Sequence, residues 1–326
     1  MSSCHKSLNE QKMDENCKRL LGKKQVLALI LGNCVPEYMG RSREEICACI
    51  SDSVKINCER VHRMEPENII GENTEDATID EGTIYFDVKF TARSAENAEE
   101  YIILNIEAQN NLHPGYPLAK RATYYAARLL SAQKKTVWEH SDYHRQQKVY
   151  SIWVFLKPDK NRKGFINLYK PCEKQLYGDY TLDEKKYSDF NFIFLGLSEN
   201  DNENEMIDLL STYFSDNTPR EKRADTLIKI GIPKEEAIKE ADTMCHYSQL
   251  IKNEALAEGE AKGRAEGEAK GRAEGRAEAH AKTLRTVMAK MHIELDEAMD
   301  FLNIPVADRA TIKNVVNAMT ADGEEA

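Results

Sequence analysis

The chain has 326 residues, of which 41% are hydrophobic, and a formal net charge of −10 at pH 7. This length exceeds that of one typical domain, so we expect one sizeable core with an appendage. The negative charge argues against a general nucleic-acid binder, because phosphate contacts need Lys and Arg.

The sequence predicts a cytoplasmic protein with no membrane partner. Its most apolar run, residues 25–35, is too short to cross a bilayer, and residues 1–19 lack the apolar core of a secretory signal. The cysteines lack the paired spacing of a zinc site, so reduced thiols are the simplest interpretation. The eight cysteines are Cys4, Cys17, Cys34, Cys47, Cys49, Cys58, Cys172 and Cys245.

The first expected elements are a polar tail over residues 1–20 and helices within residues 24–52. Apolar side chains recur at helical spacing in the second segment. Ser42 and Glu45 form the Ser-x-x-Glu pattern of a helix capping box, so we expect a helix to begin there.

Two strands are predicted next, at residues 82–90 and 101–111, joined as an antiparallel hairpin by a long polar loop. Side chains alternate along both strands between an apolar face and a polar face. Asp87 and Glu107 lie on the polar faces, and Gln109 points the same way as Glu107. A carboxylate so close to a core must stay in water, gain a partner or bind a cation.

A helix at residues 118–133 and strands at 148–156 and 188–197 complete the predicted core. Together these elements predict a mixed α/β (α+β) domain over residues 21–215, with a central mixed sheet flanked by helices. Residues 216–252 are expected to form a helical connector.

The C-terminal part begins with a repeat: AEGEAKGR occurs at residues 257–264 and again at 265–272. Ala, Glu, Lys and Arg favour a helix, whereas each glycine opposes it by about 1 kcal/mol. Residues 253–280 are therefore predicted to be a solvated helical spacer arm, with self-association through the small Ala and Gly side chains as the alternative. Residues 281–326 are amphipathic and predict a small helical unit.

Charge is segregated along the chain. Residues 64–111 contain twelve Asp or Glu against two Lys or Arg, whereas residues 112–165 contain eleven Lys or Arg against three acids. Chance placement on solvated faces is one interpretation, and a cation site beside a phosphate-binding surface is the other.

Asp87 and Glu107 on adjacent strands are suitable ligands for Mg²⁺, which commonly takes one or two carboxylates, waters and phosphate oxygens. Gln109 would then orient a water molecule or contact a phosphate. Spacing alone leaves a simple polar sheet edge as the alternative.

Residues 71–90, 101–133 and 148–156 together resemble the PD-(D/E)XK nuclease family transposases, the Rpn recombination-promoting nuclease group. The resemblance covers about residues 20–200, and the Gly-rich charged arm with its helical tail is also similar. It implies a restriction-endonuclease-like core with a C-terminal helical extension.

The resemblance also implies roles for individual residues. Asp87 corresponds to the metal-binding Asp of the second core strand, and Glu107 to the acid of the E-x-K element. The Ala108 carbonyl would be a further metal ligand. Gln109 stands where the general family has Lys, and an amide cannot supply a positive charge.

Lys120 or Arg121 on the following helix would supply that missing charge. Glu37 is the candidate for the helical carboxylate of the family, with a surface glutamate as the alternative. We therefore predict a Mg²⁺-dependent DNA endonuclease of recombination or transposition, in which Mn²⁺ can substitute for Mg²⁺. A homodimer would suit double-strand cleavage. The alternatives are a catalytically silent DNA-binding or assembly module of the same fold and an RNA-directed nuclease.

Overall fold

The computed structural model describes residues 7–56, 75–78, 82–95, 97, 99–110, 112–134, 136–157, 163–198 and 203–321. The chain divides into two compact units, Met1–Ile251 and Lys252–Ala326. In chain order the elements are α1 (Leu8–Leu21), α2 (Lys24–Cys34), η1 (Pro36–Tyr38), α3 (Arg43–Cys49), β1 (Lys55–Ile56), β2 (Glu75–Thr78), β3 (Gly82–Tyr85), β4 (Val88–Arg93), β5 (Tyr101–Gln109), α4 (Leu118–Ser131), η2 (Tyr143–Arg145), β6 (Lys148–Phe155), β7 (Phe165–Tyr169), η3 (Glu184–Lys186), β8 (Phe190–Gly196), α5 (Glu205–Phe214), α6 (Arg220–Ile230), α7 (Lys234–Met291), α8 (Leu295–Phe301) and α9 (Val306–Ala321).

The first unit is built on a mixed sheet with strand order β1-β4-β5-β6-β8-β7. β4 pairs with β5 in antiparallel fashion, as the hairpin prediction required, whereas β5, β6 and β8 are parallel neighbours. The helix α4 connects β5 to the parallel strand β6, which is the usual crossover arrangement. The mixed α/β class with a sheet flanked by helices is thus confirmed.

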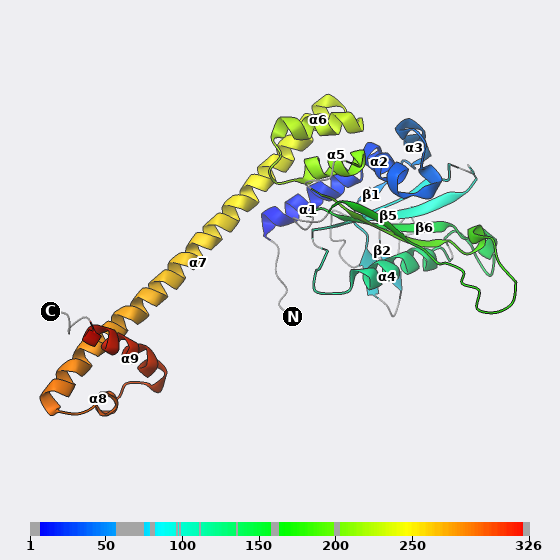
Figure 1. Ribbon diagram of the computed structural model, residues 1–326. Helices are drawn as coiled ribbons and strands as arrows, with labels where there is room; N and C mark the ends of the chain where they lie inside the picture. Colours follow the sequence, from blue (N-terminus) through cyan, green and yellow to red (C-terminus); the bar gives the residue numbers. More distant parts are fainter. Residues whose placement is uncertain are drawn as a thin grey trace. The chain divides into compact units, whose positions relative to one another are not determined.

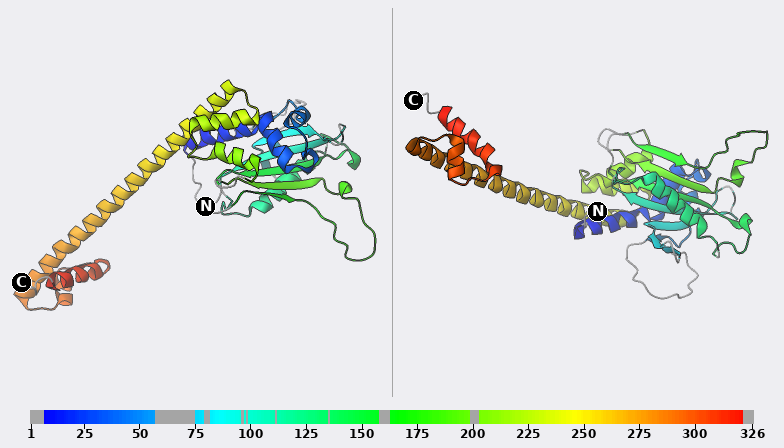
Figure 2. Two further views of the ribbon diagram at one scale, coloured as in Figure 1. Left: turned by 45° about the horizontal axis from the view of Figure 1, so that its top comes forward. Right: turned by 90° about the horizontal axis from the view of Figure 1, so that it is seen from below.

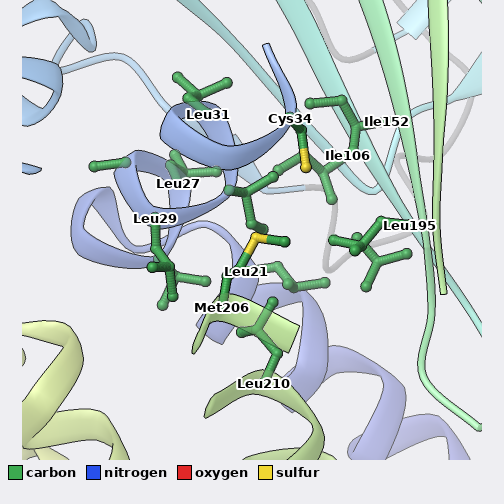
Figure 3. Close-up of a cluster of buried hydrophobic side chains, with 14 of the residues drawn as sticks. Leu21, Leu27, Leu29, Leu31, Cys34, Ile106, Ile152, Leu195, Met206 and Leu210 are labelled. Carbon is green, nitrogen blue, oxygen red and sulfur yellow. The ribbon is translucent and has the colours of Figure 1, made fainter. Parts of the chain in front are cut away.

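Helices cover both faces of this sheet (Figure 1). One face packs against α1, α2, α3, α5 and α6 through a large apolar cluster. The other face packs against α4 through a smaller cluster rich in aromatic rings, and the view from below in Figure 2 has α4 across the front of the sheet. Figure 3 shows the first cluster, in which the labelled side chains are Leu21, Leu27, Leu29, Leu31, Cys34, Ile106, Ile152, Leu195, Met206 and Leu210.

The central strand β5 is buried on both faces from Ile102 to Ala108. Its even-numbered side chains enter the larger cluster, and Ile103 enters the cluster under α4. The predicted polar row that contains Asn105 and Glu107 therefore lies inside the molecule, because α4 covers that face. These groups consequently need partners within the protein.

The predicted strand over residues 82–90 is wrong as a continuous element. The structure divides it into β3 and β4, with a break at Phe86 and Asp87. β3 pairs with β2 in a separate two-stranded sheet, and β4 pairs with β5. As a result Phe86 packs in the α4 cluster, whereas Val88 packs on the opposite face of the sheet.

The predicted polar tail is also wrong for residues 8–20, which form most of α1. Ser7 and Glu10 make a complete capping box at its start, and Cys17, Leu20 and Leu21 are buried in the core. These apolar residues lie on one side of the helix, and burying them stabilises it. The mostly polar composition of the segment gave no indication of this. Residues 1–6 lie outside the described residues.

The capping box at Ser42 and Glu45 is present in α3, as predicted. The helical connector after residue 215 is present as α6 and the start of α7, and its side chains Leu227, Ile230 and Met244 join the core. The short edge strand β7 was not predicted from the sequence.

The second unit contains the end of α7, α8 and α9. Side chains of the repeat are exposed from residue 253 to 276, so the prediction of a solvated helical arm over residues 253–280 agrees with α7 except at Ala277, which is buried. Ala277, Ala281 and Leu284 pack against α8 and α9 in a separate apolar core. In the described part of the chain, no helix has the length and apolar character needed to cross a membrane.

Candidate metal centre

Asp87 and Glu107 meet at the end of β5. Asp87 follows the break after β3, one residue before β4 begins. Its backbone N–H donates to Glu107 Oε1 at 3.2 Å, and the Ala108 N–H donates to Asp87 Oδ2 at 2.9 Å. These reciprocal bonds tie the Asp87 carboxylate to β5 and the Glu107 carboxylate to the backbone of the break before β4.

Glu107 is buried and Asp87 is partly buried. Glu107 is 2% exposed, and the Asp87 side chain is 16% exposed. Burial raises the pKa of Glu107 well above its ordinary value, and the charge of Asp87 adds to the rise. Burial also raises the pKa of Asp87, although the nearby Lys18 ammonium opposes this. Desolvation is thus the main cause of both shifts, and the cations beside the pair offset only part of it.

The oxygen donors of this pair fit a hard divalent cation. The Ala108 carbonyl lies on the same side of β5 as its N–H, which bonds Asp87, because both backbone groups of a strand residue point to one neighbouring strand. Asn105 Nδ2 donates to Glu107 Oε1 at 3.0 Å. The buried Asn105 Oδ1 accepts no hydrogen bond from the described residues, so one more buried oxygen of β5 is without a donor.

A cation from α1 contacts Asp87 directly. Lys18 Nζ lies 2.8 Å from Asp87 Oδ1 and 3.2 Å from Asp14 Oδ2, one helical turn away on α1. Burial lowers the pKa of Lys18, but the two carboxylates outweigh it and raise the pKa overall. Sequence reasoning missed both residues because they fell in the expected tail. The four-residue spacing of Asp14 and Lys18, behind the capping pattern of Ser7 and Glu10, was the available signal.

Arg121 approaches from the opposite layer, on α4. Its guanidinium donates to Tyr116 Oη at 2.5 Å and Tyr125 Oη at 2.9 Å. It lies 5.6, 5.1 and 5.3 Å from the ring centroids of Tyr116, Tyr125 and Trp153. Trp153 is the β6 residue opposite Glu107 in the sheet register, and the Arg121 charge lowers the pKa of Glu107. These three rings, which we call the aromatic cage, therefore hold the Arg121 charge near the Glu107 carboxylate.

Of the two predicted cationic residues on α4, only Arg121 is half-buried, and Lys120 is exposed. Gln109 lies two residues beyond Glu107 at the half-buried end of β5. Its side chain lies on the α4 face of the strand because of the alternation.

Glu37 is not part of this site. Lys148 Nζ donates to Glu37 Oε1 at 2.7 Å, and Tyr150 Oη donates to Glu37 Oε2 at 2.9 Å. Lys148 pairs with Ile102, at the far end of β5 from Glu107. Tyr150 packs in the cluster on the face opposite α4. The prediction of Glu37 as a helical carboxylate of the site is therefore wrong, because the sheet separates it from Glu107.

Within the described ranges, no three His, Cys, Asp or Glu side chains form a group that could hold a metal ion on their own. A cation here would use the two carboxylates and backbone oxygens, with water or a ligand completing its shell. Comparison with family models, curated proteins and solved structures finds no match for this chain.

Proposed function

We propose that this chain is a metal-dependent DNA endonuclease with a restriction-endonuclease-like core, which acts in the cytoplasm in recombination or transposition. One observation carries the proposal: Asp87 and Glu107 converge at the end of β5 with a hydrogen bond between their residues. A buried and a partly buried carboxylate with raised pKa values, side by side at a strand end, are typical of a functional site.

Asp87, Glu107 and the Ala108 carbonyl would hold Mg²⁺, and Mn²⁺ could replace it. Bound there, Mg²⁺ supplies Lewis-acid activation of water and neutralises charge at phosphorus. The Gln109 amide orients the attacking water, and the Arg121 guanidinium counters the phosphate charge. The aromatic cage keeps that guanidinium in place before the substrate arrives, and such preorganisation is the main source of electrostatic stabilisation.

A nucleic-acid substrate has support from the charge distribution, because phosphate contacts need Lys and Arg. Residues 112–165, which include α4, contain eleven Lys or Arg against three acids. α4 carries Arg121 toward the carboxylates, so this basic segment begins beside the site. A homodimer would place two such sites on the two strands of a duplex.

A plasmid-nicking assay tests the proposal, with wild type, Asp87→Asn and Glu107→Gln in Mg²⁺, Mn²⁺ and EDTA. We expect cleavage that needs the metal and that both variants lose. Glu37→Gln is the matched control, because Glu37 is also a partly buried carboxylate with hydrogen-bond partners but lies away from the site. It should cleave like wild type.

Three outcomes would count against the proposal. Equal cleavage by Asp87→Asn and wild type would show that the site is misassigned. Absence of cleavage by the folded wild type in every metal would favour a catalytically silent DNA-binding or assembly module. Stronger competition by RNA than by DNA would indicate an RNA-directed nuclease.

A further inference from the structure

Both oxygens of the Asp87 carboxylate already have a partner, and Lys18 is the partner of Oδ1. Asp87 Oδ2 accepts the Ala108 N–H at 2.9 Å, and Lys18 Nζ lies 2.8 Å from the other oxygen, Oδ1. A divalent cation that binds Asp87 through Oδ1 must therefore displace the Lys18 ammonium or share the oxygen with it.

A second partner for the ammonium lies within reach. Lys18 Nζ is 3.2 Å from Asp14 Oδ2, and Asp14 lies one turn earlier on the same helix. The backbone of α1 is fixed at this point, because Cys17, Leu20 and Leu21 are buried in the core. Only the flexible stem of Lys18 has to move for the charge to shift from Asp87 toward Asp14.

We propose that Lys18 is a built-in competitor for the cation at Asp87, and that Asp14 receives its ammonium when the cation binds. The proposal rests on the proposed function and describes how that site is regulated. Without a cation, Lys18 neutralises Asp87 and stabilises the pair of buried carboxylates. When the cation binds, the ammonium is released but stays beside the site through Asp14.

The consequence is a site that binds divalent cations more weakly than its carboxylates alone would allow. Removing the competitor should therefore tighten cation binding, although Lys18 is not a ligand of the cation. Removing the Asp14 carboxylate should weaken cation binding. Of the two carboxylates that Lys18 contacts, Asp87 then remains, so the ammonium competes more strongly for it.

The test is isothermal titration calorimetry of full-length wild type and variants with Mn²⁺ alone, in 0.15 M and 0.5 M salt. The measured quantity is the affinity for Mn²⁺. Lys18→Gln should bind Mn²⁺ at least about fivefold more tightly than wild type, which is the lower range of a coupling between sites. The gain should persist in high salt, since a contact between partly buried groups is screened little.

Lys157→Gln is the matched control. Like Lys18, the Lys157 ammonium lowers the pKa of the nearby Cys17 thiol, but its side chain is 60% exposed and pairs with Asp216. The substitution Lys157→Gln therefore removes the same charge from the same region without changing a contact to Asp87. Its effect on Mn²⁺ affinity should be small and should disappear in 0.5 M salt.

Asp14→Asn is measured alone and in the Lys18→Gln background. A loss of affinity that vanishes in the double variant is expected if Asp14 acts through Lys18. Unchanged or weaker Mn²⁺ binding by folded Lys18→Gln, while wild type binds Mn²⁺, would overturn the competition alone. Absence of Mn²⁺ binding by wild type and Lys18→Gln alike would overturn the metal site of the proposed function as well.

Discussion

Replacing Arg121 by Met is expected to destabilise the unit Met1–Ile251 by about 3 kcal/mol. The guanidinium donates two hydrogen bonds, at 2.5 and 2.9 Å, and lies within 5.1–5.6 Å of three ring centroids. A hydrogen bond from a charged donor contributes about 1.5–3 kcal/mol, and a cation–π contact about 0.5–1 kcal/mol at exposed sites. We take the lower values and subtract about 1.5 kcal/mol for the contacts that the Met sulfur regains with the rings, while the entropy cost of ordering the side chain is similar for Arg and Met and cancels.

Thermal unfolding followed by tryptophan fluorescence measures this loss. The two tryptophans, Trp138 and Trp153, both belong to Met1–Ile251, so the signal reports on that unit. A loss of about 3 kcal/mol corresponds to a fall in Tm of about 6–12 °C for a domain of this size. Arg121→Lys should recover less than half of it, because an ammonium lacks the planar fork that contacts both tyrosines.

Lys120→Met is the control, since Lys120 is the exposed neighbour of Arg121 on α4. It should change the free energy of unfolding by less than about 0.5 kcal/mol. A loss below about 1 kcal/mol in Arg121→Met, or an equal loss in Lys120→Met, would refute the stabilising role of the aromatic cage.

Two further predictions concern the cysteines and the second unit. Burial raises the pKa of Cys17 and of Cys34 to about 12, so native labelling at pH 8 should modify exposed Cys172 and spare both. Unfolded thiols ionise near their ordinary pKa of 9.0, so the free energy of unfolding should fall between pH 9 and 12, as urea titrations would measure. Leu284→Ala should lower the free energy of unfolding of the second unit by about 2–5 kcal/mol, because Leu284 is fully buried. Thermal unfolding followed by circular dichroism should show this loss, with the tryptophan signal unchanged.

Local patterns predicted most strands and helices of the core, because alternation and helical spacing follow from the residues themselves. The same patterns failed at Phe86 and Asp87. Alternation runs unbroken through residues 82–90, and nothing local indicates that β3 pairs with β2 while β4 pairs with β5. Pairing of this kind depends on contacts between distant segments, so the break could not be derived from the pattern.

The carboxylates of the site could be predicted and their partners could not. Asp87 and Glu107 were found because both occupy the polar side of predicted neighbouring strands. Lys18 lies 69 positions before Asp87 in the numbering, and its ion pair depends on how α1 packs on the sheet. Glu37 shows the same limit, since its bond to Lys148 joins residues 111 positions apart.

The two carboxylates are neutralised from opposite layers, and this difference determines how an ion would reach them. The Asp87 side chain is 16% exposed and Glu107 is 2% exposed, so solvent has its access at Asp87, where Lys18 lies. Arg121 lies on the other face, held by its aromatic cage. An incoming cation therefore meets Lys18 before Glu107. Asp87→Asn should consequently abolish cation binding outright, whereas Glu107→Gln should leave weak binding at Asp87 while cleavage is lost.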